Sequence, residues 1–198
     1  MYKRQVTHHA RHSRATPQRL WEAARTVRVR DTRTLRPIMS WRLGRYAPPA
    51  DTPLRTVLSS HPFHLLAEKG MVSVSGLGGK LWALGDTFVR FDTPEAFRAW
   101  AEPGFCKVAV RHEVHPDGAG GSEIESEVRI WCTSRGAQLR FRPYWAFIGP
   151  FSRFIGSELL SAATRRAERT SAAAASARAT SSAAPAATIA VTRSSIRS

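Results

Sequence analysis

The strongest hydrophobic pattern in the chain lies near its C-terminus, in residues 138–169. Apolar side chains recur there at intervals of three or four, which places them on one face of an α-helix. They are Leu139, Tyr144, Trp145, Ile148, Phe151, Ile155, Leu159 and Ala162. Burying eight such side chains would contribute at most about 12–24 kcal/mol, so we expect the rest of the chain to pack around this helix. Pro150 predicts a bend near Gly149, because proline removes a backbone donor and crowds the preceding turn.

The clearest strand pattern flanks the glycine-rich stretch 116–122, where alternating residues predict an antiparallel pair of strands centred on Ala119. One face of this pair sets Cys106 against Cys132, Val108 against Ile130, Val110 against Val128, His112 against Ser126 and Val114 against Ile124. We expect this mainly apolar face to point to the core. The other face, expected to be exposed to water, sets Arg111 against Glu127, Lys107 against Trp131 and Glu113 against Glu125. The last pair is unfavourable unless Arg111 contacts Glu125 diagonally.

Shorter elements are predicted elsewhere. In chain order we expect a polar edge strand at 6–15, a helix that starts at Thr16 and Pro17, a second helix ending near residue 43, a segment at 54–60 that fits a helix, a hairpin of 63–68 and 71–75, a strand at 87–91 and a brief helix starting at Thr93. Residues 1–169 are expected to form one domain. Residues 170–198 are mostly Ala, Ser and Thr and predict a disordered tail; an alanine-rich extension of the helix is the alternative.

The formal net charge of +15 is concentrated at the two ends of the chain. Residues 1–46 contain 12 lysines and arginines against two acidic residues, whereas residues 47–163 contain 12 basic and 12 acidic residues. Residues 164–198 contain six arginines against one glutamate. A basic surface exposed to water is the favoured interpretation, and attraction to nucleic acid or to an anionic membrane surface is the alternative.

Cysteine content and hydropathy favour a cytoplasmic protein. The chain has only two cysteines and no N-terminal apolar leader. Cys106 and Cys132 are expected to be inert buried thiols, with a disulfide as the alternative. Residues 144–163 are the most apolar stretch of this length, but Arg153, Glu158, two glycines and Pro150 interrupt it, so we expect no membrane span.

Metal and cofactor motifs are not predicted. His8 and His12 would share a face of a strand but lie about 13 Å apart, too far for one ion. Lys80 follows three glycines but no Ser or Thr follows it, so a phosphate-binding loop is not expected. We therefore predict no metal ligand, no cofactor and no catalytic residue, and nothing in the pattern indicates an oligomeric state.

Four short motifs and the order of elements resemble the START-like superfamily, also called SRPBCC, which includes the Bet v 1-like and polyketide cyclase/dehydrase proteins. The motifs are Thr16-Pro17-Gln18-Arg19-Leu20-Trp21, Gly79-Lys80-Leu81-Trp82, Phe97 through Glu102-Pro103-Gly104-Phe105, and Phe141-Arg142-Pro143-Tyr144-Trp145 continuing to Ile148-Gly149-Pro150-Phe151. The resemblance covers about residues 2–169. It implies an α+β helix-grip fold, with a curved antiparallel sheet around a long C-terminal helix, two short helices after the first strand, and a lipid-like or polyketide-like ligand. The superfamily has no universal catalytic residues.

These observations predict a protein that binds a small hydrophobic molecule between sheet and helix. The expected lining residues are Val110, His112, Ser126, Val128, Tyr144, Ile148 and Phe151, with the polar ones orienting the ligand. One alternative is a cyclase-type enzyme with His112 as general base. Another is binding of nucleic acid or an anionic surface through the basic termini.

Overall fold

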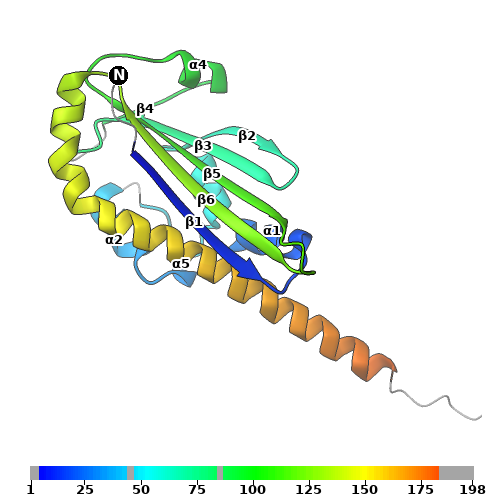
Figure 1. Ribbon diagram of the computed structural model, residues 1–198. Coiled ribbons are helices and arrows are strands. Elements are labelled where there is room, and N and C mark those ends of the chain that lie inside the picture. The colour runs from blue at the N-terminus through cyan, green and yellow to red at the C-terminus, as the bar shows by residue number, and fades with distance from the viewer. Residues whose placement is uncertain (1–4, 44–46, 84–86, 183–198) are drawn as a thin grey trace, which may run out of the picture.

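A six-stranded antiparallel sheet forms one layer of the structure, and one long helix with several short helices forms the other (Figure 1). The computed structural model describes residues 5–43, 47–83 and 87–182. Its strands are β1 (Gln5–Ser13), β2 (His64–Lys69), β3 (Val72–Gly79), β4 (Phe88–Val89), β5 (Cys106–Pro116) and β6 (Ser122–Cys132). Neighbouring strands follow the order β1-β6-β5-β3-β2, and β4 pairs with β3. The first strand of the chain therefore lies beside the last.

The helices lie mainly on the concave face of this sheet, which gives the α+β helix-grip arrangement expected above. They are α1 (Pro17–Thr26), α2 (Leu35–Leu43), α3 (Leu54–Ser59), α4 (Pro94–Ala99) and α5 (Arg135–Ser182), with a 3-10 turn at Val29–Asp31. Two short helices after the first strand are confirmed as α1 and α2, and α3 follows them. Pro17 lies in the first turn of α1 and Pro94 in the first turn of α4, where a missing backbone N–H costs no helical hydrogen bond.

The predicted register of β5 and β6 is confirmed at every position. Cys106 faces Cys132, His112 faces Ser126 and Val114 faces Ile124. The inward face is the apolar one, since Val108, Val114, Ile124 and Ile130 are all buried. Cys106 and Cys132 are buried free thiols. The hydrogen bond with Cys132 and burial raise the pKa of the Cys106 thiol, which keeps it protonated and unreactive.

One expectation for the outer face, that Lys107 is exposed, is wrong. Lys107 is buried, with 3% of its surface exposed, because α4 and Trp131 cover it. Its Nζ donates to the Arg98 carbonyl at 2.9 Å and lies 4.8 Å from the centre of the Trp131 ring, and burial lowers the pKa of this amine. Only Trp131 is exposed in that pair.

Glu125 lies opposite Glu113, the pair that is unfavourable unless Arg111 contacts it diagonally. Arg111 instead binds Glu113, with 2.5 Å between Nη2 and Oε2. Histidines on both neighbouring strands bind Glu125: His8 from β1 at 3.3 Å and His115 from β5 at 3.2 Å. The pairing of β1 with β6 brings His8 there, and the local hairpin pattern does not contain this information.

Helix α5 is longer than expected. It continues to Ser182, so the expectation of a disordered tail from residue 170 is wrong for residues 170–182, and the alanine-rich extension is correct there. Alanine has the highest helix propensity, which explains why this part is helical although most of residues 168–177 are exposed. Residues 183–198 lie outside the described residues. Figure 1 shows α5 changing direction between its yellow-green first part and its yellow and orange remainder, and Pro143 and Pro150 both lie inside the helix.

The largest buried contact between the two layers joins α1, the ends of β5 and β6, and α5. Leu20, Ile124 and Leu160 are almost completely buried there. Within the described residues, no helix combines the length and the apolar composition needed to cross a membrane.

Replacing Leu160 with Ala should lower the free energy of unfolding by about 2–5 kcal/mol, because a fully buried leucine leaves a cavity when it is truncated. Phe154→Ala in the same helix is the matched control. Phe154 is 58% exposed, so its truncation should cost less than about 0.5 kcal/mol. Urea denaturation of both variants measures the difference. Equal, small losses would show that α5 does not pack on the sheet through Leu160.

Candidate functional site

A cavity of about 280 Å³ lies between the concave face of the sheet, α5 and the short helices α2 and α3. Its sheet wall includes Leu77, Val108, Val110, His112, Ser126, Val128 and Ile130, and its α5 wall includes Phe141, Tyr144, Trp145, Ile148, Phe151, Ser152, Ile155 and Leu159. Leu35, Ile38 and Met39 of α2 and Leu54, Val57 and Leu58 of α3 close the remaining side. No Asp, Glu, Lys or Arg among the described residues lines this cavity.

All seven residues expected to line the cavity do so. Val110 and His112 come from β5, and Ser126 and Val128 from β6, because residues two apart on a strand share a face. Tyr144, Ile148 and Phe151 come from α5, where a spacing of four and three keeps them on one face. Phe151 is 47% exposed, so it lies at the edge of the cavity. The role of these residues in binding a ligand stays a prediction.

A row of polar side chains crosses the otherwise apolar sheet wall. The register places His9 of β1 opposite Ser126, Ser126 opposite His112, and His112 opposite Ser73 of β3. Directly opposed residues of antiparallel strands point to the same face. The row therefore lies at one level of the inner face, and His112 and Ser126 are the members that line the cavity.

His112 is neutral in this environment. It is surrounded by protein and burial lowers the pKa of its imidazole to about 4. The part of its surface that remains exposed faces the cavity. Among the described residues, no hydrogen bond is made to the imidazole of His112 or to the hydroxyl of Ser126. A neutral imidazole offers one donor and one acceptor, and a hydroxyl offers both, so these two groups can bind a polar atom of a ligand.

His9 is the inward histidine that the sequence did not identify. Its ring packs against Gly156 of α5, where an added Cβ would lie 2.7 Å from Cδ2 and 3.0 Å from Nε2. Within the described residues Nε2 is buried and has no hydrogen-bond partner. Burial, followed by the charges of Arg11, His8 and Arg153, lowers the pKa of His9. Gly156 thus provides the space that lets β1 approach the helix beside the cavity.

A smaller cavity of about 50 Å³ adjoins the first and shares His112, Leu54, Leu58 and Leu159 with it. An ion pair lies at its margin. Glu68 of β2 accepts hydrogen bonds from Arg55 of α3, the shorter one at 2.6 Å, and lies 3.8 Å from Arg25 of α1. The hydrogen bond from Arg55 lowers the pKa of the Glu68 carboxyl. The three charged groups that line the smaller cavity are therefore paired with one another, two arginines with one glutamate.

Strand alternation alone predicts part of the position of His9. His9 lies one residue from His8, so the two must point to opposite faces of any strand that contains them. Which of them points inward depends on how β1 pairs with β6, and that pairing joins residues more than 100 positions apart. The closure of the cavity by α2 and α3 also depends on long-range packing.

No family model matches this chain, and no curated protein matches it. Among solved structures, the crystal structure of TTHA0849 from Thermus thermophilus is similar over 84% of this chain and 99% of that chain, with 12% sequence identity and a TM-score of 0.36. A likeness this low identifies neither a family nor an activity. Function therefore has to be inferred from this chain's own residues.

Acid should destabilise the fold between about pH 6.5 and pH 4 through His112. The unfolded chain binds a proton on this histidine at about pH 6.5, whereas the folded chain binds it only near pH 4, so protonation favours unfolding. The loss through this residue is up to about 3 kcal/mol. In His112→Leu the decrease in unfolding free energy over this range should be smaller by that amount, as measured by urea denaturation at several pH values.

Ser126→Ala is the matched control, because it removes the neighbouring hydroxyl and keeps the imidazole. Its pH dependence should equal that of the wild type. His9 and His64, whose pKa values are also lowered by burial, leave a residual slope in every variant. An NMR titration of His112 that gave a pKa near 6.5 would contradict the assignment.

Proposed function

We propose that this chain binds a small, largely apolar and uncharged molecule in the cavity between the sheet and α5. The observation that carries the proposal is a cavity of about 280 Å³ with apolar walls in which His112 and Ser126 have no hydrogen-bond partner among the described residues. Small-molecule sites are typically concave and mainly apolar, with a few polar groups that fix the orientation of the ligand. An uncharged ligand is favoured because no charged side chain of the described residues lines the cavity.

A hydroxyl or carbonyl group on the ligand would pair with the polar row. A polar group that is buried without a partner costs about 1–3 kcal/mol. A ligand oxygen that reached His112 or Ser126 would remove part of this cost. The proposed ligand is therefore an apolar body with one polar oxygen, as in a medium-chain alcohol, a fatty acyl ester or a polyketide-like ring. Membership of the START-like superfamily, suggested by the sequence motifs, agrees with this ligand class and stays part of the proposal.

Binding is favoured over catalysis as the role of His112. A general base works best when its pKa lies near the working pH, and burial lowers the pKa of His112 to about 4. No carboxylate among the described residues lines the cavity to orient or strengthen the imidazole. A hydrogen-bonding role needs neither feature.

The cytoplasmic location and the role of the basic termini are also part of the proposal, and the cavity adds no support for either. The free thiols Cys106 and Cys132, which face each other across β5 and β6, fit a reducing compartment such as the cytoplasm. The basic residues proposed for nucleic-acid or anionic-surface binding lie partly in residues 1–4 and 183–198, outside the described residues. Of the described ones, Arg28 and Arg30 both pair with Asp51.

Narrowing the cavity should weaken the binding of an apolar probe. N-phenyl-1-naphthylamine, whose fluorescence rises in apolar sites, is added to the untagged chain and its affinity is measured. Val128→Phe places a larger side chain on the sheet wall and should weaken binding at least about tenfold, because its ring occupies part of the space that the probe needs. Val6→Phe, on the same sheet but 56% exposed, should leave the affinity unchanged. Equal affinities in the two folded variants would show that the probe binds elsewhere.

Removing the polar groups of His112 and Ser126 should weaken the binding of a ligand with a hydroxyl group and leave that of an alkane unchanged. Displacement of the probe is compared for 1-octanol and octane, which differ by one hydroxyl. The double variant His112→Leu with Ser126→Ala should weaken 1-octanol about fivefold to tenfold, the value of one hydrogen bond, and leave octane unchanged. If both ligands lost the same affinity, the two residues would shape the cavity without recognising a polar atom.

A further inference from the structure

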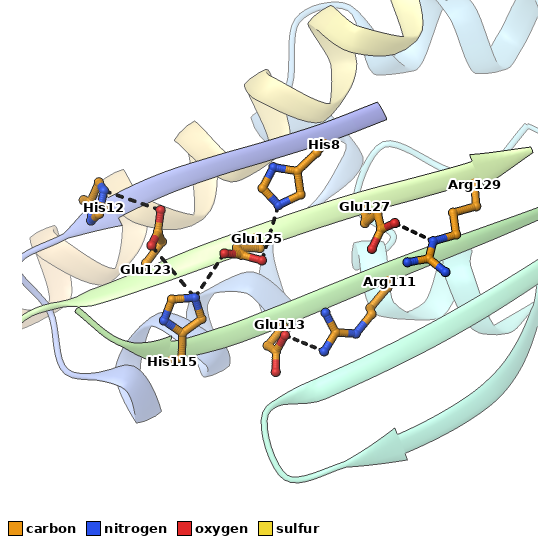
Figure 2. A network of polar contacts seen from close by, with 9 residues as sticks. All are labelled: His8, His12, Arg111, Glu113, His115, Glu123, Glu125, Glu127 and Arg129. Atoms are coloured by element: carbon orange, nitrogen blue, oxygen red, sulfur yellow. Dashed lines mark hydrogen bonds and ion pairs between the residues drawn. The ribbon is translucent and has the colours of Figure 1, made fainter. Parts of the chain in front are cut away.

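The convex face of the sheet, opposite the cavity, carries a cluster of histidines and glutamates from three neighbouring strands (Figure 2). His115 lies near the end of β5, Glu123 and Glu125 lie on β6, and His8 and His12 lie on β1. The register sets Glu123 between His12 and His115, which all point to the outer face. Neither the cavity nor the proposed ligand uses any of these residues.

The side chains of His115, Glu123 and Glu125 converge on one point. The Nε2 atom of His115 lies 3.2 Å from Glu125 Oε1 and 3.9 Å from Glu123 Oε2. One ligand atom of each residue lies within 4.8 Å of the other two. Figure 2 shows the His115 ring pointing up between the two carboxylates.

We propose that His115, Glu123 and Glu125 bind a divalent transition-metal ion, with Zn²⁺ as the best fit. Zinc binds histidine nitrogen at about 2.0–2.1 Å and carboxylate oxygen at about 2.0–2.2 Å, so two ligand atoms of a tetrahedral site lie about 3.3–3.5 Å apart. The His115 to Glu125 distance of 3.2 Å is close to this value, and the His115 to Glu123 distance of 3.9 Å reaches it by a small rotation of the half-buried Glu123 side chain. A nitrogen ligand with two carboxylates favours zinc over calcium and magnesium, which prefer oxygen alone.

The histidines of β1 hold the two glutamates of this site in position. The outer oxygen of each glutamate contacts one of them: Glu125 Oε2 lies 3.3 Å from His8 Nε2, and Glu123 Oε1 lies 3.4 Å from His12 Nε2. One oxygen of each carboxylate thus faces the metal position. A histidine on β1 holds the other oxygen in place. Hydrogen-bonded partners of this kind orient the ligands in metal sites.

This arrangement replaces the histidine pair that the sequence suggested and geometry rejected. His8 and His12 are too far apart to share one ion, and here each supports a different glutamate. The site has three protein ligands, so a water molecule would complete a tetrahedral zinc. Because its ligands come from both strands next to the 116–122 turn, a bound ion would fasten β5 to β6 at their turn end.

Isothermal titration of the untagged full chain with Zn²⁺ tests the proposal. The wild type should bind one ion per chain. His115→Ala and the double variant Glu123→Gln with Glu125→Gln should weaken binding at least about tenfold, and the double variant His8→Ala with His12→Ala should also weaken it by about tenfold, the effect expected of residues that orient ligands. Glu113→Gln is the matched control, since Glu113 lies on the same face but pairs with Arg111. It should bind Zn²⁺ within about twofold of the wild type.

An NMR titration of the wild type makes the result independent of the folding of any variant. Zn²⁺ should shift the side-chain signals of His115 and, more weakly, His8 and His12. The proposal is overturned if the wild type binds no Zn²⁺, if His115→Ala binds it as tightly as the wild type, or if the shifts appear at His61, His64 or the cysteines instead. None of these outcomes affects the cavity, which lies on the other face of the sheet.

Discussion

The contact between the inner face of β5 and β6 and the apolar face of α5 determines where everything else in this structure can lie. Four of the five opposed pairs of that face are apolar and give the sheet a mainly apolar concave surface, and α5 follows it because its own apolar residues recur at helical spacing. The contact is dense where Ile124 meets Leu160. It opens toward His112 and Ser126, where the cavity begins. The short helices α2 and α3 then complete a wall that sheet and long helix leave incomplete.

Because side chains alternate along β5, β6 and β1, the two faces of the sheet carry different sets of polar groups. The inner face presents neutral polar groups, a histidine and a serine, to an apolar space. The outer face presents histidines to ionised carboxylates. The environment rather than the residue type decides the behaviour of each histidine: burial lowers the pKa of His112, whereas hydrogen bonds to the Pro116 carbonyl and to Glu125 raise the pKa of His115. The two histidines are three residues apart on β5, yet the pKa of one is lowered and the pKa of the other is raised.

Local patterns were sufficient to predict the parts of the structure that depend on local pairing. The β5–β6 register follows from two alternating runs around a glycine-rich turn, and a shift by one residue would expose the apolar face. The lining residues of the cavity follow from that register and from the helical spacing of α5. Residue pairs joined across distant segments could not be predicted in this way. His9 enters the inner row and His8 reaches Glu125 only because β1 pairs with β6, and Lys107 is buried only because α4 folds over it. The helical residues 170–182 show the reverse case, in which intrinsic alanine propensity is sufficient without much packing.

The cavity has a consequence for the stability of the whole chain. Its walls come from four strands, α2, α3 and α5, so no single element forms it and any global unfolding removes it. Side chains that border a void lack dispersion contacts on that side, and a molecule that restores these contacts binds the native state alone. The melting temperature of the protein would then rise with the concentration of such a molecule. A rise in thermal stability in the presence of a cell extract fraction would therefore report any molecule that occupies the cavity, whatever its chemical structure.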